Sequence, residues 1–137
     1  MSASSHHAHG VLDTSVVIDL SVIPDELLPI TSAITAITLA ELSHGPHTAT
    51  EPAERIKRRE LLQDIESRYP APLAFGAPAA RRYGSLVALI VAKGRSPRSR
   101  RMDLMIAAIA STLGIPLFTR NRDDFIGLES AVEVVAV

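Results

Sequence analysis

The stretch RMDLMIAAIASTLGIPLFT, residues 101–119, decides the fold of this chain. Asp103 to Leu113 is apolar on nearly all sides, which is typical of a buried helix, and Gly114 is a residue type that commonly ends one. Ile115 to Thr119 is a short apolar run, which predicts a buried strand. A helix followed at once by a buried strand is the repeating element of a parallel α/β sheet.

The rest of the chain repeats this alternation. Gly10 to Ile18 opens with a short apolar run and predicts a strand followed by a helix through Leu20, with Thr14 and Ser15 offering cap hydroxyls. The remaining pattern predicts a strand over 30–37, a helix over 38–43 ended by His44-Gly45-Pro46, a helix over 51–68, a strand over 73–75, a helix over 78–92, a loop over 94–99 and a strand over 132–137. We therefore expect an α/β fold with a central parallel sheet of four to five strands flanked by helices.

Composition narrows the class of protein. The chain has 137 residues, enough for one domain, and its 47% hydrophobic and 21% charged residues are typical of a globular protein. It has no cysteine, which excludes disulfides and thiolate metal sites and permits a reducing cytosol. The longest apolar run, Leu86 to Ala92, is far shorter than the roughly 18 residues of a membrane span. We expect a soluble, cytoplasmic protein without a membrane partner.

The first nine residues lack the basic and apolar regions of a signal peptide. We expect residues 1–9 to be a disordered tail and residues 10–137 to form the domain. The tail's three histidines are compatible with a native polar segment or with an added tag.

Three carboxylates far apart in the sequence each lie where a predicted strand gives way to a helix: Asp13, Glu41 and Asp103. In parallel α/β sheets, ligands collect at the carboxyl ends of the strands, so we expect these side chains to meet. Crowded carboxylates repel one another unless a cation lies between them, and Mg²⁺ and Mn²⁺ prefer oxygen ligands. The arrangement predicts a divalent-metal site suited to phosphodiester chemistry.

Each carboxylate also has a structural alternative. Asp13 is placed to cap the following helix. Thr38 and Glu41 match a capping box, in which the glutamate bonds to the backbone of the threonine. Asp103 follows two arginines and could form a surface ion pair with Arg100 or Arg101.

A fourth group of oxygen ligands follows the predicted strand that ends at Thr119. Asn121 could bind a metal through its amide oxygen, and Asp123 or Asp124 could complete the cluster. The alternative for this motif is a turn stabilised by its own Asn and Asp side chains.

The charges are unevenly distributed. One basic cluster lies at residues 55–59 and another, without an intervening acid, lies at residues 93–101. Patches of opposite sign suit a site that holds a cation while its rim attracts a polyanion. The alternative is that these residues form ordinary solvated surfaces.

Four motifs in this order resemble the PIN-domain ribonucleases, and more narrowly the VapC toxins of bacterial type II toxin–antitoxin pairs. The resemblance covers Gly10 to Val137 and rests on Leu12-Asp13-Thr14-Ser15, Ala40-Glu41-Leu42 with Gly45, Asp103 to Ala110, and Leu117 to Asn121 with Asp124-Phe125. It implies a PIN-like fold and an endoribonuclease that uses Mg²⁺, or Mn²⁺ as a substitute, to cleave structured RNA such as tRNA or rRNA. Such cleavage inhibits translation and growth.

The resemblance also assigns roles to residues. Asp13, Glu41 and Asp103 match the acidic residues of the family as metal ligands and catalytic groups. Many members have an aspartate where this chain has Asn121, so Asn121 is the expected fourth ligand and Asp124 the expected fourth catalytic acid. The residues expected to contact the RNA backbone are Arg98, Arg100 and Arg101.

The implied partners are a VapB-type antitoxin, a second copy of the chain and the RNA. A hetero-oligomer of toxin and antitoxin is therefore expected. The alternative function is a non-catalytic PIN-like module that binds RNA or protein, and Asn121 favours it. A haloacid-dehalogenase-like phosphatase or a receiver domain is disfavoured because no second aspartate lies close to Asp13.

Overall fold

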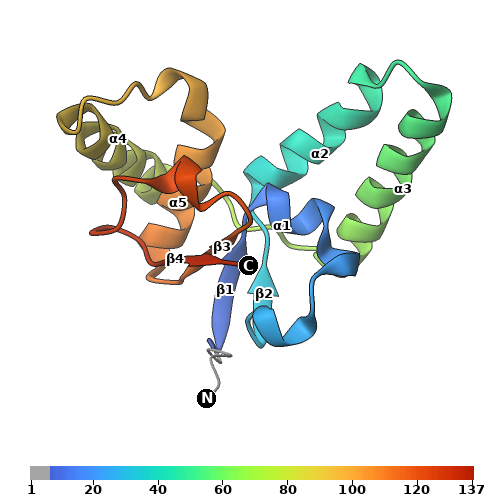
Figure 1. Cartoon of the computed structure of the whole chain (residues 1–137), viewed down its shortest axis with the longest axis horizontal. Helices are drawn as coiled ribbons and strands as arrows, with labels where there is room; N and C mark the ends of the chain where they lie inside the picture. Colours follow the sequence, from blue (N-terminus) through green and yellow to red (C-terminus); the bar gives the residue numbers. More distant parts are fainter. Residues whose placement is uncertain (1–6) are drawn as a thin grey trace.

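The computed structural model describes residues 7–137 and contains a four-stranded sheet flanked by helices (Figure 1). The strands are β1 (His9–Leu12), β2 (Thr31–Ala33), β3 (Leu117–Thr119) and β4 (Val134–Ala136). The helices are α1 (Thr14–Ile18), α2 (Ala36–Thr48), α3 (Pro52–Arg68), α4 (Ala77–Ala92) and α5 (Arg101–Leu113), with short 3₁₀ helices at Leu20–Val22, Asp25–Leu27, Arg98–Arg100 and Arg122–Phe125. All strand pairs are parallel, in the order β2-β1-β3-β4. The predicted α/β class and parallel sheet are confirmed.

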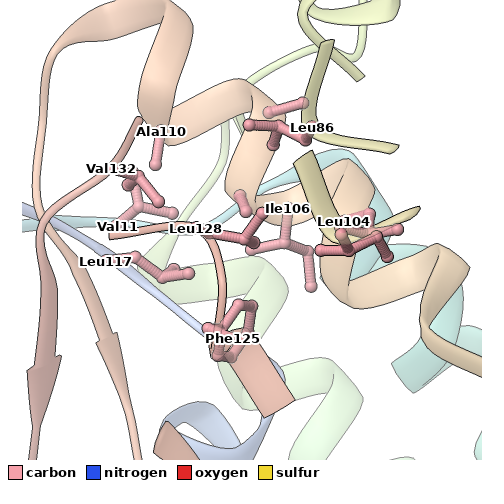
Figure 2. Packing of buried hydrophobic residues seen from close by; sticks show 12 residues of the cluster. Val11, Leu86, Leu104, Ile106, Ala110, Leu117, Phe125, Leu128 and Val132 are labelled. Atoms are coloured by element: carbon pink, nitrogen blue, oxygen red, sulfur yellow. The ribbon is translucent and has the colours of Figure 1, made fainter. Parts of the chain in front are cut away.

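The two central strands separate two hydrophobic cores. Successive side chains of a strand point to opposite faces, so Val11 and Leu117 contribute to one core while Leu12 and Phe118 contribute to the other. Helices α4 and α5 cover the first core, and α1, α2 and α3 cover the second, so the helices form two separate groups in Figure 1. Figure 2 shows Val11 and Leu117 in the cluster of the first core, which also includes Ile106 and Ala110 of α5.

Helix α5 is the buried helix that the sequence predicts. A run of its residues is almost fully buried: Ile106, Ala107, Ala108, Ile109 and Ala110. Gly114 ends the helix in the left-handed region, with φ of 67°, a conformation that glycine adopts without steric cost. The helix thus delivers the chain directly into β3 beside β1.

The predicted end of the helix over 38–43 is wrong, because this helix, α2, continues through His44-Gly45-Pro46 to Thr48. The reason is tertiary: α3 packs along α2, and the Nη1 of Arg58 donates a hydrogen bond to the carbonyl oxygen of Gly45 at 3.0 Å. A proline removes one N–H donor from a helix, and here packing against α3 outweighs that local stop signal.

The strands are shorter than predicted. The run 30–37 contributes only Thr31–Ala33 to the sheet, because Thr35 already caps α2. The predicted strand 73–75 is reduced to a single bridge between Leu73 and Thr35.

The predicted tail is too long at its C-terminal end. The carbonyl oxygens of His7 and Ala8 each accept a hydrogen bond at 2.9 Å, from the backbone N–H groups of Ile30 and Thr31. His9 is the first residue of β1. Pairing with the next chain segment therefore orders residues 7–9, while residues 1–6 of the predicted tail lie outside the described residues. Within the described part, no helix is long and apolar enough to cross a membrane.

Candidate acidic active site

Asp13 lies at the carboxyl end of β1 and is 3% exposed. Its Oδ2 accepts hydrogen bonds of 2.8 Å from the hydroxyls of Ser15 and Thr119. The side chain does not cap α1, so the capping alternative for this residue is wrong. The hydroxyls of Ser15 and Thr119 instead hold the buried carboxylate of Asp13 in a fixed orientation.

Glu41 is not part of a capping box. The N-cap of α2 is Thr35, whose Oγ1 accepts a hydrogen bond from the backbone N–H of Thr38 at 3.2 Å, so Thr38 lies inside the helix. The Oε1 of Glu41 accepts a 2.6 Å hydrogen bond from the Oγ1 of Thr14, which also lies 2.9 Å from the Oγ1 of Thr38. Glu41 is therefore turned toward the start of α1, next to Asp13.

Asp103 is half-buried in the first turn of α5 and lies near the other carboxylates. Burial, followed by the negative charges of Asp13, Asp124 and Glu41, raises the pKa of Asp103 to about 7, and the positive charge of Arg100 acts in the opposite direction. Asp103 forms no ion pair within residues 7–137. The three carboxylates predicted from the sequence thus share one electrostatic site.

The segment after β3 supplies the fourth carboxylate. Asp124 is half-buried and acts on Asp103, whereas Asp123 is exposed and does not contribute to the Asp103 shift. Asn121 is exposed, and its backbone N–H donates to the Oγ1 of Thr119 at 2.9 Å. Of the three residues that the sequence left open, Asp124 is the one that joins the acidic cluster, and Asn121 lies at its rim, where residues 120–124 line a hollow of about 630 Å³.

The three predicted RNA-binding arginines differ in their surroundings. The side chains of Arg98 and Arg101 are exposed and form no hydrogen bond or ion pair with residues 7–137. The Nη1 of Arg100, in contrast, donates to the carbonyl oxygen of Asp123 at 3.1 Å and lies 3.6 Å from the Oδ1 of Asp124.

Sequence reasoning missed the hydroxyls that orient the carboxylates. Thr14 and Ser15 were interpreted only as helix caps, and the buried Thr38 and Thr119 were not singled out for the site. Arg120 was also missed: its Nη1 pairs with the Oδ2 of Asp19 at 3.0 Å and its backbone N–H donates to Ser15 at 3.1 Å. The available signal was the placement of Thr and Ser directly after each apolar run, beside the predicted acids.

The donor set fits a hard divalent cation. The four carboxylates and Asn121 offer only oxygen ligands, and burial together with the neighbouring negative charges raises the pKa of Asp103. Within residues 7–137, no three His, Asp or Glu side chains lie close enough together to form a coordination shell.

A groove of about 580 Å³ leads away from the acidic cluster between α1 and the α2–α3 hairpin. Thr14 and Glu41 lie at one end of it, and its remaining lining is Ile18, Asp19, Ser21, Leu42, Gly45, Glu54, Lys57, Arg58 and Leu61. The groove joins an apolar floor to both acidic and basic side chains.

The parallel sheet, with an acidic cluster near the carboxyl ends of its two central strands, defines an α/β domain whose site offers oxygen donors. Residues 10–129 match the PIN domain family. The chain is also 35% identical over 144 residues to Ribonuclease VapC5 of Mycobacterium tuberculosis, with 98% of this chain and 99% of that protein covered. The chain therefore belongs to the PIN-domain family and, within it, to the VapC ribonucleases.

Solved structures agree with this placement. The structure of VapBC-5, a member of the VapBC family of toxin–antitoxin systems from Mycobacterium tuberculosis, matches with a TM-score of 0.83 at 35% identity, covering 95% of this chain and 99% of that chain. FitAcB from Neisseria gonorrhoeae matches with a TM-score of 0.71 at 25% identity, over 91% and 95% of the two chains. VapBC2 from Rickettsia felis, bound to a DNA fragment from its promoter, shares the fold with a TM-score of 0.70 at 24% identity, over 92% and 96%.

Proposed function

We propose that this protein is the toxin of a VapBC-type toxin–antitoxin pair, a divalent-metal-dependent endoribonuclease whose single PIN domain spans residues 10–137. Its substrate is structured RNA, tRNA or rRNA, and its cleavage inhibits translation and growth. The observation that carries the proposal is that Asp13, Glu41 and Asp124 all act on the half-buried Asp103, in a chain similar to Ribonuclease VapC5 along nearly its whole length. Such a protein acts in the cytoplasm.

Asp13 and Asp103 would hold a Mg²⁺ or Mn²⁺ ion, with Glu41 and Asn121 completing the ligand set. Such an ion would polarise a phosphate oxygen and lower the pKa of a coordinated water. Burial and the neighbouring acids raise the pKa of Asp103 to about 7, and a cation held there would favour its charged form.

The protein's own groups orient the reaction. Thr14 holds one oxygen of Glu41, which leaves the other to help hold the cation or to orient the attacking water as a general base. Asp124, the fourth proposed catalytic acid, adds a further negative charge that acts on Asp103. In-line attack by water on the phosphate gives products with a 5′-phosphate and a 3′-hydroxyl.

Arg98 and Arg101 are free to contact phosphates of the RNA near the start of α5. Such contacts give salt-dependent affinity with little sequence information. The chain has two tyrosines and three phenylalanines, so base stacking is a minor resource and RNA shape is the better source of specificity.

The antitoxin would lie in the groove between α1 and the α2–α3 hairpin. An apolar floor with charged walls suits an amphipathic helix, and the groove leads to Glu41, so an occupant reaches the acidic site. VapBC from Salmonella typhimurium, which shares the fold at 22% identity and a TM-score of 0.69, was solved bound to DNA.

We expect a homodimer that joins the antitoxin in a hetero-oligomer, since symmetric dimers are the commonest assembly.

The test is cleavage of structured RNA by purified protein in EDTA, Mg²⁺ or Mn²⁺. Asp13→Asn and Asp103→Asn should each lose metal-dependent cleavage while keeping the circular dichroism spectrum of the wild type. Glu60→Gln, at an exposed position of α3, is the matched control and should remain active. Full activity in both aspartate variants would overturn the assignment.

The second candidate function is a non-catalytic PIN-like module that binds RNA or protein. Asn121 favours it, because an amide stands where many family members have an acid. Thermal denaturation in millimolar Mn²⁺, together with the cleavage assay, separates the two functions. A catalytic protein is stabilised by the ion and cleaves RNA, whereas a binding module is not stabilised and does not cleave RNA.

A further inference from the structure

Arg100 differs from its basic neighbours because its side chain is engaged inside the protein. It ends the short 3₁₀ helix Arg98–Arg100 and reaches across to the segment after β3. Its side chain is 25% exposed, and its Nη1 contacts both the backbone of Asp123 and the carboxylate of Asp124. The Nη1 of Arg100 is thus committed to this segment, whereas the side chains of Arg98 and Arg101 form no hydrogen bond or ion pair with another described residue.

The segment that Arg100 contacts, residues 121–125, is otherwise held at its two ends. At one end the backbone N–H of Asn121 donates to the buried Thr119, and at the other Phe125 is 1% exposed in the first hydrophobic core. Between these anchors, Asp124 is tied to its own segment by the bond from its backbone N–H to the carbonyl oxygen of Asn121, at 3.0 Å. Among the described residues, Arg100 is the side chain from another part of the chain that bonds to the middle of the segment.

The charges at the site give this restraint a consequence. Asp124 and Asp103 repel each other, and repulsion would push an unrestrained Asp124 out toward solvent. The guanidinium of Arg100 pairs with Asp124 and acts favourably on Asp103 as well. It therefore lies where it can hold the two acids near each other in the absence of a cation.

We propose that Arg100 is a positioning residue for Asp124: it fastens residues 121–125 to the start of α5 and keeps the carboxylate of Asp124 facing the acidic site. This inference rests on the proposed metal-dependent nuclease, and it replaces the expectation that Arg100 serves mainly to bind RNA. Arg98 and Arg101 keep that role.

Binding of Mn²⁺ to the RNA-free protein provides the first test. Loss of a positive charge alone would tighten the binding of a cation. Loss of positioning has the opposite sign, so Arg100→Ala should weaken Mn²⁺ binding severalfold in calorimetry, and Arg100→Lys should restore most of it. In an Asp124→Asn background the same Arg100→Ala change should no longer weaken Mn²⁺ binding, because the double-mutant cycle isolates the Arg100–Asp124 interaction. Equal or tighter Mn²⁺ binding by Arg100→Ala would overturn the proposal.

Steady-state cleavage provides the second test. Arg100→Ala should lower kcat roughly tenfold or more with KM and its salt dependence unchanged, since misplacement of a group at the reacting centre costs rate rather than affinity. Arg98→Ala, as the matched control, should raise KM and reduce its salt dependence with kcat unchanged. If Arg100→Ala behaves like Arg98→Ala, then Arg100 is an RNA contact and the positioning role is wrong.

Hydrogen exchange separates failure of this inference from failure of the proposed function. Without metal or RNA, amides of residues 121–126 should exchange faster in Arg100→Ala than in the wild type, and those of β1 should not. A wild type that neither binds Mn²⁺ nor cleaves RNA would sink the nuclease assignment, and unchanged exchange in this segment would sink the positioning role.

Discussion

The two halves of the acidic site are built in different ways. Asp13 and Glu41, from the N-terminal third of the chain, each accept a hydrogen bond from a neutral hydroxyl. Asp103 and Asp124, from the C-terminal third, are governed by burial, mutual repulsion and Arg100. Hydroxyls orient a carboxylate without neutralising it, whereas the other pair carries a charge imbalance. We therefore expect the half with Asp13 and Glu41 to be the more rigid one, and the half with Asp103 and Asp124 to respond more strongly to a bound cation.

The largest expected effect on stability comes from the hydroxyl-held half. Thr119→Val removes a fully buried donor to Asp13 and the acceptor of the Asn121 N–H. Leaving such partners unsatisfied costs about 1–3 kcal/mol of the free energy of unfolding. Urea denaturation measures it, with Thr112→Val, whose hydroxyl bonds within α5, as a control expected to lose less. Equal losses in the two variants would show that Asp13 does not depend on Thr119.

The next largest effect on stability is expected at Asp103, in the half of the site that carries the charge imbalance. Here the substitution should raise stability instead of lowering it. The folded state raises the pKa of Asp103 to about 7, so the folded protein binds more protons than the unfolded chain between about pH 4 and 7. The stability from this group is therefore complete below pH 4 and is lost as the pH rises through 7. In EDTA, Asp103→Asn should raise Tm at pH 8 and leave it nearly unchanged at pH 4.

The effect of Mn²⁺ on Tm should also depend on Asp103. Saturating Mn²⁺ at pH 8 should raise the Tm of the wild type and have much less effect on Asp103→Asn. Glu60→Gln removes the same charge from an exposed helix surface and should follow the wild type throughout. A wild-type Tm that does not change between pH 4 and 8 in EDTA would contradict the loss of stability predicted from the raised pKa of Asp103.

A smaller effect is expected at Thr14, which is only partly buried. Thr14→Val removes the 2.6 Å donor to Glu41 and should cost about 0.5–1.5 kcal/mol of the free energy of unfolding. It should also lower kcat and weaken the binding of Mn²⁺, because Glu41 loses its orientation. Thr14→Ser keeps the hydroxyl and should restore the rate. If the serine variant is as slow as the valine variant, packing of the methyl group and not the hydrogen bond is the cause.

The smallest effect concerns the surface outside both halves. Arg101→Ala removes an exposed arginine that has no partner within the described residues. Its stability should be unchanged, and the slope of log K against log salt for RNA binding should fall by about 0.7–0.9, the value of one phosphate contact. Binding titrations at several salt concentrations measure this slope, and an unchanged slope would remove Arg101 from the RNA surface.

Much of the fold was predictable because it depends on local pattern. The apolar run of α5, its glycine end and the following strand each follow from residues adjacent in the sequence, and the parallel class follows from their alternation. The limits of α2 were not predictable, because Gly45 and Pro46 are local stop signals that packing against Arg58 overrides. Helix ends that depend on another helix are absent from any local pattern.

The candidate site divides in the same way. The sequence places Asp13, Glu41 and Asp103 at strand-to-helix junctions, and a parallel sheet brings such junctions to one edge. The sequence does not show that Glu41 accepts from Thr14, which lies 27 residues away, or that Asp124 rather than Asp123 faces the cluster. Those choices depend on distances across the fold. Direct tests of the site residues are the variants described above.

The short edge strands β2 and β4 limit how this protein can assemble. Each has three residues, and beyond β2 the chain is already bridged by Leu73, so little open backbone ladder is left for a partner strand. Association by strand addition would therefore gain few hydrogen bonds. An antitoxin or a second copy must instead be recognised by side chains on helices and grooves, so pairing specificity can change by surface substitution while the sheet that carries the acids stays the same.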